Sequence, residues 1–454
     1  MPSPFAPGQF VLESSSTHPT QPVPNSHPAH QPLRFKSDGT FQISIFEDLH
    51  FGENAWDSWG PQQDLASIGV INSLLDSEPA TDLVVLNGDL ITGENTFLEN
   101  ATSYLDMIVS PIAARGKTWA STYGNHDHQY NISGETIFAR EKSARWRGHS
   151  RTKSMVRGEL AGTSNYYLPV YAADCAAPGG HAQEHGHEEE EAEEEDGGET
   201  IESHCTPELL LWFFDSKGGF RYQQKDPSTG EPIGLQNWVD ISVVDWWQQT
   251  YAKLLARHHG AKRIPSMAFV HIPTYASLEF QRDVGVDPHT EPGINDDVPA
   301  SPQAQGWCPD GSDKGTCSYG GQDLPFMQAV ATMPGLMGVF SGHDHGNTWC
   351  YKWHEAALPL PGMMAVTGEG RINKKNNGVN LCFGQHTGYG GYGSWERGAR
   401  QILVSRDQLA LLEMDSWIRL ESGNVVGSVS LNATYGEDEY PATKSTMTHC
   451  PKCN

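Results

Sequence analysis

The apolar and polar positions of the 454-residue chain fall into short stretches that predict strands, separated by stretches with helical spacing. Residues 41–46 alternate as a strand does, and 83–86 and 118–122 have the composition of buried strands. Helical spacing follows from Pro61 and again over 97–114. The order strand, helix, strand, helix, strand predicts a largely parallel sheet with helices on both faces.

Further apolar stretches extend this pattern into the second half of the chain. Residues 166–170 and 209–214 are typical of a strand pair, and 267–270 and 336–340 of two more strands. After residue 349 short strands dominate, which predicts a second sheet packed on the first. The expected fold class is therefore α/β, with two packed mixed β-sheets flanked by helices.

Changes in composition predict how the chain is divided. Residues 1–38 are rich in Pro, Ser and His and predict a flexible N-terminal arm. One domain is expected over 39–435, with an acidic, His-rich insertion at 174–205 and a long Pro-, Gly- and Asp-rich loop at 279–321. Residues 436–454 read as a C-terminal tail. The insertion histidines could capture a metal, but a solvated hairpin tip is the favoured interpretation.

The charge of the chain limits its partners. A formal net charge of −26 repels nucleic acid and anionic lipid over long range, so no stable nucleic-acid partner is expected. A small anionic substrate is still possible, because bound metal cations invert the local field. No apolar run approaches the roughly 18 residues of a transmembrane helix, so no transmembrane segment is expected. The oligomeric state stays open.

Eight cysteines and three glycosylation sequons favour an oxidising environment, secreted or in the endomembrane lumen, over a cytosolic protein with reduced thiols. No signal peptide is recognised in the first 40 residues. The connectivity is open, since eight cysteines allow about 105 patterns. The close pairings are Cys175 with Cys205, Cys308 with Cys317, Cys350 with Cys382, and Cys450 with Cys453. The candidate glycosylation sites are Asn100, Asn131 and Asn432.

Ligand-capable side chains stand at the ends of five predicted strands. Ligands of open α/β sheets gather outside the carboxyl ends of strands, so these side chains are expected to converge. Any one of them alone would read as a cap, a turn or a structural histidine, but all five groups in order favour a metal site. Two carboxylates, one amide and four imidazoles suit two borderline metals such as Mn, Fe or Zn. The set is Asp48, His50, Asp89, Asn125, His271, His343 and His345.

The five groups occur in order as Asp-x-His, Gly-Asp, Gly-Asn-His-Asp, a lone His and Gly-His-x-His. This pattern resembles the calcineurin-like metallophosphoesterase superfamily. The flanking residues, including the glycine-rich stretch 387–394, resemble its fungal and plant branch, often called purple-acid-phosphatase-like. The resemblance spans roughly residues 35–420. It implies a metallophosphoesterase α/β sandwich and a binuclear metal centre that hydrolyses phosphate esters.

The resemblance also implies residue roles. A bridging hydroxide would attack the phosphoryl group, and two metals would lower its pKa. His126 would face the substrate, together with Asn125, and protonate the leaving oxygen or stabilise the transition state. Asp127 is a candidate orienting group for His126. By the same resemblance Asp48, His50 and His345 would hold the first metal, Asn125, His271 and His343 the second, and Asp89 would bridge them. Alternating side chains along an extended segment would let His343 and His345 serve different metals.

The chain departs from the purple enzymes in one informative way. Those enzymes place a tyrosine, an iron ligand that gives the colour, three residues after the bridging aspartate. The chain has Thr92 there, and it also carries His50, which the purple branch lacks. We therefore expect a colourless enzyme whose metals need not include ferric iron.

Three functions fit these motifs. A phosphomonoesterase is the leading hypothesis, with a small phosphate ester as substrate. A phosphodiesterase acting on nucleotides or phospholipid headgroups would use the same site, and the loop 279–321 is expected to decide how open the cleft is. A non-catalytic metal-binding protein would lack a ligand or His126, and the sequence lacks neither.

Overall fold

The computed structural model describes residues 31–175, 205–258, 261–317, 319–353, 378–450 and 453. Most of the expected N-terminal arm and of the insertion at 174–205 lies outside the described residues. Both stay predictions.

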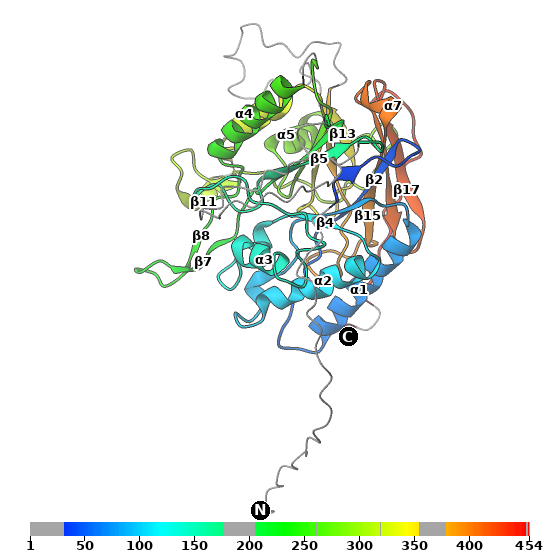
Figure 1. Ribbon diagram of the computed structural model, residues 1–454. Coiled ribbons are helices and arrows are strands. Elements are labelled where there is room, and N and C mark those ends of the chain that lie inside the picture. Colours follow the sequence, from blue (N-terminus) through cyan, green and yellow to red (C-terminus); the bar gives the residue numbers. More distant parts are fainter. Residues whose placement is uncertain are drawn as a thin grey trace, which may run out of the picture.

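Two mixed β-sheets form the centre of the molecule (Figure 1). The first sheet contains, in spatial order, β17 (Val425–Leu431), β16 (Met414–Leu420), β15 (Gly398–Ser405), β2 (Thr40–Phe46), β3 (Leu83–Asn87) and β4 (Trp119–Thr122). The second contains β1 (Leu33–Arg34), β5 (Tyr166–Tyr171), β6 (Leu209–Phe214), β9 (Ser266–Val270), β12 (Leu336–Ser341), β14 (Val379–Phe383) and β13 (Cys350–Trp353).

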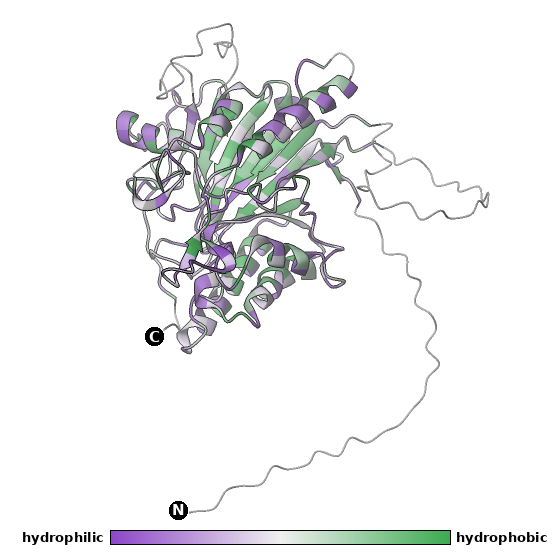
Figure 2. Ribbon diagram, turned by 90° about the vertical axis from the view of Figure 1, so that its left-hand side faces the viewer, coloured by the Kyte–Doolittle hydropathy of each residue, from purple (hydrophilic) through white to green (hydrophobic). Residues whose placement is uncertain are grey.

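The sheets pack face to face through an apolar core, and most of the described helices cover their outer faces. Side chains from both sheets, among them Ile43 and Phe269, fill the space between them. Figure 2 shows the strands largely in hydrophobic colours and the hydrophilic colours concentrated on helices and loops. The first sheet is covered by α1 (Trp59–Ser77), α2 (Tyr104–Ala114) and α3 (Gly134–Glu141). The second is covered by α4 (Ile241–Arg257), α5 (Tyr275–Glu279) and α6 (Leu324–Thr332).

The two-sheet α/β class is confirmed, but two details of the prediction are wrong. Neither sheet has helices on both faces, because each uses one face to bury the other. The C-terminal strands do not make a separate second sheet. Strand β14 extends the second sheet beside β12, whereas β15 pairs antiparallel with β2 through Arg400 and Ile45. Long-range pairing of this kind leaves no local pattern in the sequence.

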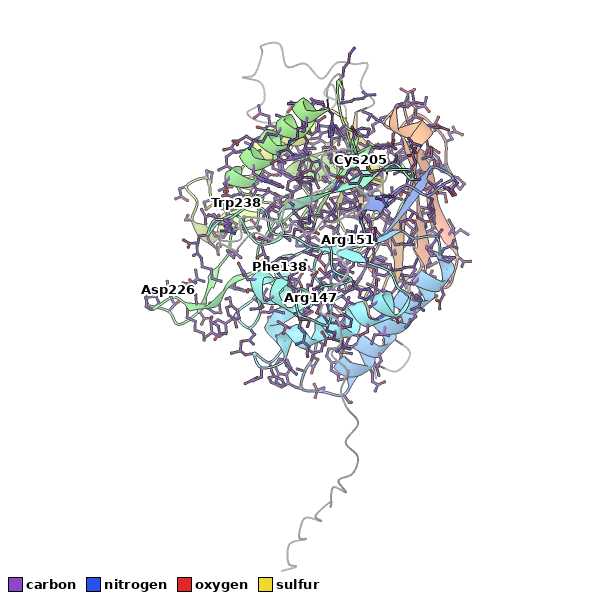
Figure 3. The ribbon with its side chains drawn as sticks, in the orientation of Figure 1. Phe138, Arg147, Arg151, Cys205, Asp226 and Trp238 are labelled. Atoms are coloured by element: carbon purple, nitrogen blue, oxygen red, sulfur yellow. A yellow bond between two sulfur atoms is a disulfide. The ribbon has the colours of Figure 1, made fainter. Side chains whose placement is uncertain are left out.

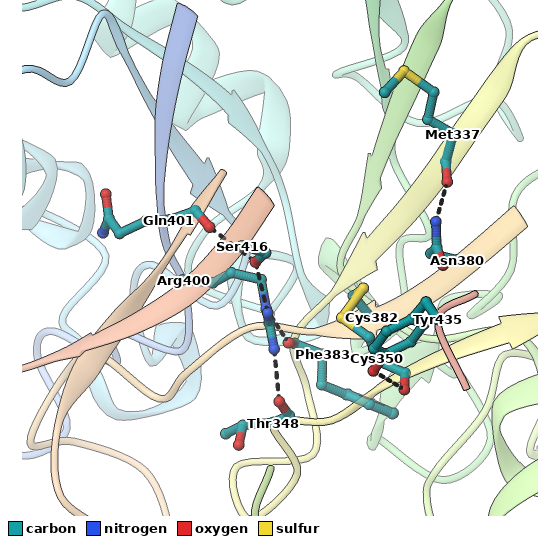
Figure 4. The surroundings of a disulfide bond; sticks show 10 residues. All are labelled: Met337, Thr348, Cys350, Asn380, Cys382, Phe383, Arg400, Gln401, Ser416 and Tyr435. Carbon is teal, nitrogen blue, oxygen red and sulfur yellow. Dashed lines mark hydrogen bonds between the residues drawn. A yellow bond between two sulfur atoms is a disulfide. The ribbon is translucent and has the colours of Figure 1, made fainter. Parts of the chain in front are cut away.

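Buried Arg400 ties the two sheets together (Figure 4). It belongs to β15, yet its guanidinium donates to the carbonyls of Phe383, at 2.7 Å, and Thr348, at 2.6 Å, on the second-sheet side. Close by, a disulfide joins Cys350 and Cys382, which face each other across the antiparallel pair β13 and β14. The sandwich is thus linked by a buried cation as well as by apolar packing.

The loop expected over 279–321, and a segment for which no element was predicted, both contain regular structure. The start of the loop 279–321 belongs to α5 and the π-helix Phe280–Val284, and its end contains the hairpin of β10 (Gly306–Trp307) and β11 (Asp313–Cys317). A hairpin of β7 (Phe220–Lys225) and β8 (Pro232–Gly234) projects from the body (Figure 1). Its strand β7 has only two apolar side chains, Phe220 and Tyr222, and both are exposed, so the periodic signal is weak.

Candidate metal centre

Ligand-capable side chains from both sheets meet at one edge of the sandwich. The strands β2, β3 and β4 of the first sheet and β9 and β12 of the second each lead directly into one of them. Two clusters result, each with ligand atoms within 4.8 Å of one another. The first cluster is Asp48, His50 and His345, and the second cluster is Asp89, His271 and His343.

The backbone at this edge adopts conformations that non-glycine residues rarely take. Asp48, His50, Asp89 and His343 have φ angles of 52°, 47°, 48° and 76°. A left-handed conformation costs about 1–3 kcal/mol at a non-glycine residue, and it persists where the surrounding structure holds it. The turn at His343 also corrects one expectation. His343 and His345 reach different clusters because the chain turns at His343, not because it stays extended.

In the first cluster the histidine Nε2 atoms face one another and the carboxylate. The Nε2 atoms of His50 and His345 are 3.2 Å apart, and that of His345 lies 3.5 Å from Asp48 Oδ1. The Nδ1 of His345 donates to the Tyr392 carbonyl at 2.8 Å. The Nδ1 of His50 donates to Thr92 Oγ1 at 3.1 Å, because that hydroxyl itself donates to Glu53 at 2.6 Å. Both Nε2 atoms are therefore left with a lone pair that can bind a cation.

In the second cluster the support comes from the backbone. The Nδ1 of His271 donates to the Asn87 carbonyl at 2.9 Å, and its Nε2 lies 2.9 Å from Asp89 Oδ2. Asp89 Oδ2 is also 3.8 Å from His50 Nε2, so this carboxylate stands between the two clusters. His343 brings its ring beside His271, with centroids 5.4 Å apart.

The electrostatics of the clusters favour positive charge. Burial opposes ionisation of both carboxylates, but His345 and His271 outweigh it at Asp48, and His271 and His126 at Asp89, so both pKa values lie below the usual one. Burial also opposes a charged His271, yet Asp89 outweighs it and raises its pKa to about 10. Burial, helped by His271, lowers the pKa of His343 to about 3. A site that holds two ionised carboxylates and attracts a proton this strongly suits a cation.

A buried polar atom without a hydrogen-bond partner indicates whether the site suits a metal ion. The side-chain oxygen of Asn125 is buried and lacks a hydrogen-bond partner, although a buried amide oxygen normally has one. Asn125 follows β4 and lies beside the second cluster. A side chain at Gly124 would collide with Asp89 Oδ1 at 2.2 Å, so the groups are packed as closely as a glycine allows. An oxygen, two carboxylates and imidazole nitrogens match the donor set of borderline metals.

His126 lies beside the clusters, but its partner differs from the one expected. Its backbone N donates to Asp89 Oδ1 at 2.8 Å, and its ring Nδ1 lies 2.6 Å from Glu94 Oε1. Burial alone would lower the pKa of His126, but Asp89 and Glu94 outweigh it and raise it to about 9. Asp127 instead accepts from the backbone N–H groups of Leu90, Ile91 and Gly124. The expected orienting role of Asp127 is therefore wrong, because its carboxylate is occupied by the backbone.

Several supporting residues could not be found from sequence. Thr92 and Glu53 hold His50, and Glu94 holds His126. Thr92 and Glu53 lie in loops and Glu94 in the short 3-10 helix Gly93–Asn95, where a hydroxyl or carboxylate has no positional signal. Tyr392 stacks on His345 with centroids 4.0 Å apart, and His386 lies 3.9 Å from the same ring.

The glycine-rich loop that follows β14 packs so closely on the metal centre that a larger residue would not fit. A side chain at Gly391 would meet His345 Cε1 at 2.5 Å and His50 Cδ2 at 2.7 Å. The loop therefore packs directly on the histidines of the first cluster. His128, by contrast, is a structural histidine, since its Nε2 pairs with buried Asp215 at 3.2 Å.

This fold and site define a class of protein. A model of the calcineurin-like phosphoesterase family matches residues 48–347, from the first candidate ligand to just beyond the last. The chain belongs to this family, and it is a metallophosphoesterase, a phosphoric ester hydrolase.

Particular relatives place the chain near the purple-acid-phosphatase-like branch. It is 23% identical over 415 residues to "Probable inactive purple acid phosphatase 14" of Arabidopsis thaliana, covering 86% of this chain and 83% of the relative. It is 25% identical over 389 residues to "Probable inactive purple acid phosphatase 28" of the same plant, covering 82% and 77%. The branch expected from the motifs is confirmed.

Two solved structures are similar over most of the chain. A dimetal phosphatase from Danio rerio has a TM-score of 0.45 at 10% identity, covering 87% of this chain and 99% of that one. A purple acid phosphatase from yellow lupin (Lupinus luteus) seeds has a TM-score of 0.41 at 13% identity, covering 88% and 55%. We draw nothing further from either.

The disulfide bonds and the exposure of the sequon asparagines bear on the expected compartment. The structure joins Cys175 with Cys205, Cys308 with Cys317, Cys350 with Cys382, and Cys450 with Cys453. Among the described residues, no helix has the length and apolar character needed to cross a membrane. Of the sequon asparagines, Asn100 is exposed, while Asn131 and Asn432 are half-buried.

Proposed function

We propose that the protein hydrolyses phosphate monoesters with two metal ions held at the edge of the sandwich. The observation that carries this proposal is the pair of neighbouring ligand clusters with Asp89 between them. Asp48, His50 and His345 would hold one ion, and Asn125, His271 and His343 the other, with Asp89 between them. Mn, Fe and Zn suit these donors. When bound, such a pair activates the attacking water and neutralises charge on the phosphoryl oxygens.

The chain's own contribution to the chemistry comes from His126. Because Glu94 holds Nδ1, the other ring nitrogen, Nε2, is left to face the reacting phosphate group. A proton on Nε2 would pass to the leaving oxygen or stabilise the charge that develops there. Asn125, the neighbouring residue, would hold a metal ion and help to position the substrate.

The wall of the cleft supports a monoester over a diester. The loop 279–321 reaches the site, where Asp297 accepts a hydrogen bond from the hydroxyl of half-exposed Tyr392. The Asn347 side chain donates to the Asp297 carbonyl at 2.8 Å and fixes this contact. A carboxylate at this position beside the metal centre would leave less room for a second ester group. A phosphodiesterase acting on nucleotides or phospholipid headgroups is the alternative.

Replacement of His126 by alanine tests the mechanism. Loss of a general acid lowers kcat about 100- to 10,000-fold, so we expect a loss in this range for a nitrophenyl phosphate ester. Metal content should stay at the wild-type level, which separates a chemical role from a ligand role. Unchanged hydrolysis would refute the assignment.

Metal analysis separates this proposal from a non-catalytic role, which the word "inactive" in the relatives' names raises for those proteins. We expect about two metal ions per chain in metal-replete buffer and a colourless protein, because Thr92 stands where a purple enzyme has its tyrosine. Fewer than about one metal per chain would remove the two-metal site. Assays of mono- and diesters with Mn, Zn and Fe would then decide the ester class.

We also propose that the protein follows the secretory route. Four disulfides support an oxidising compartment, where such bonds persist. Exposed Asn100 is the best-placed glycan acceptor of the three sequons. Enzymatic removal of N-glycans from protein expressed in a eukaryotic host should reduce its apparent mass, and Asn100→Gln should remove part of that difference.

A further inference from the structure

A hollow far along β4 from the metal centre is lined by three cationic side chains. It has a cavity volume of about 70 Å³, and none of its lining residues is acidic. Arg151, one of the three cations, donates to Thr118 just before β4 begins, whereas the metal centre lies beyond the end of that strand. Figure 3 labels Arg151 in the middle of the molecule. The lining residues are Lys142, Arg151 and Lys153 with Pro32, Leu33, Ser150, Leu168, Pro169 and Tyr171.

The extended segment 149–153 places Arg151 and Lys153 on the same face of the chain. Residues 149–153 run alongside β4, where Arg151 N donates to the Trp119 carbonyl at 2.7 Å. Side chains alternate along an extended segment, so Arg151 and Lys153 share one face. Ser150 and Thr152 occupy the other face and are fully buried.

The nearest carboxylate is occupied by interior donors and forms no ion pair with the cations. Glu141 ends α3 directly before Lys142, but its side chain is fully buried. It accepts hydrogen bonds from four interior donors, which are the Trp119 Nε1, the Tyr123 hydroxyl, and the hydroxyls of Ser150 and Thr152 at 2.5–3.1 Å. Its charge is directed into the core, away from the hollow.

Two of the three cations lack a counterion. Among the described residues, neither Lys142 nor Lys153 lies within ion-pair distance of a carboxylate. The ammonium of Lys142 has three donors, and the acceptor it reaches is the Ser150 carbonyl at a long 3.5 Å. Burial lowers the pKa of Lys142, the charge of Glu141 opposes this, and the neighbouring charge of Lys153 lowers the pKa further. An anion between the two ammonium groups would remove this repulsion.

We propose that this hollow binds a tetrahedral oxyanion, either free phosphate or sulfate or a phosphate group on a small molecule. The net charge of −26 repels polyanions such as nucleic acid over long range. A small anion reaches the three cations at short range, inside the roughly 10 Å over which salt leaves charges unscreened. Arg151 supplies a guanidinium fixed by Thr118 and by the Gln31 carbonyl, as suits oxyanion recognition.

Calorimetric titration of the metal-loaded full chain with inorganic phosphate tests the proposal. The double variant Lys142→Met with Lys153→Met removes both charges and keeps the apolar stems. We expect wild type to show two classes of phosphate site and the double variant only one, with an unchanged Ki for phosphate as an inhibitor of hydrolysis. Lys253→Met, at an exposed position of α4, should behave as wild type.

Two further arms complete the design. Binding of sulfate would indicate a site for a free inorganic anion. Binding of methylphosphonate, which is not hydrolysed, would indicate a site for a phosphate-like group carried on an organic molecule. The variant Lys142→Arg with Lys153→Arg should retain the second site, which shows that charge and not lysine packing is required. Identical isotherms for wild type and the double methionine variant would overturn the proposal, as would a single phosphate site in the wild type.

Discussion

The two ligand clusters are supported in different ways. In the second cluster the outer nitrogen of His271 is held by the Asn87 carbonyl, a backbone group inside the sandwich that any residue at that position supplies. In the first cluster the outer nitrogen of His50 is held by the Thr92 hydroxyl, which depends on Glu53. The comparison shows that the first cluster can be tuned by substitution in loops, whereas the second is fixed by the fold.

The largest expected effect comes from the residue that lies between the two clusters. Asp89→Asn keeps the shape of the side chain but removes the charge between His50 and His271. We expect kcat/KM to fall at least about 1,000-fold, since metal-based charge stabilisation is worth several kcal/mol and each 1.36 kcal/mol is tenfold. Metal content, measured by plasma emission, should fall for both ions. Loss of only one metal ion would contradict the proposal that Asp89 helps to hold both ions.

A smaller effect, on metal affinity, should differ between the two clusters. Thr92→Val removes the hydroxyl that receives the His50 Nδ1 proton and keeps the side-chain volume. Groups that orient a ligand histidine typically contribute about 10- to 100-fold in metal affinity or activity. We expect one of the two metals to be lost more easily on dialysis against a chelator, while the other stays as in wild type. Thr92→Ser, which keeps the hydroxyl, is the matched control. Equal loss of both metals would contradict the difference between the clusters.

The last prediction concerns stability rather than activity, in the loop that follows His50. Buried Asp64 accepts a hydrogen bond from Gly52 N at 3.0 Å, and burial raises its pKa to about 7. The neutral form is favoured in the folded protein, so its stabilising contribution is complete below pH 4 and is lost as pH rises through about 7. The maximum change is about 4 kcal/mol for a carboxyl with an unfolded pKa near 3.9.

The variant Asp64→Asn keeps the acceptor and cannot ionise. Its unfolding free energy in urea should therefore decline less than that of wild type between pH 4 and pH 8. Glu99→Gln, at an exposed position, is a suitable control because it leaves the Gly52 contact intact. Parallel pH profiles for wild type and Asp64→Asn would show that the loop of the first cluster does not depend on this carboxyl.

The site was more predictable than the sandwich around it. The strands that lead to Asp48, Asp89 and His271 have clear local patterns, and their polar ends needed only the rule that ligands gather beyond strand ends. The division of these strands between two sheets was not predictable, because the pairing of β2 with β15 is a contact between residues such as Ile45 and Arg400. The supporting groups Thr92 and Glu94 were missed for a related reason. Their roles depend on side-chain directions in loops, which periodicity does not encode.

The order in which the ligands occur along the chain has a consequence for biosynthesis. The candidate ligands extend from Asp48 to His345, and β15, which flanks the strand before Asp48, comes later still. A ribosome-bound chain that has only exposed strands β1 to β4 would hold Asp48, His50, Asp89 and Asn125 without their partners. Metal loading is therefore expected to follow synthesis, when the last strands have been released and both halves of the centre can close together.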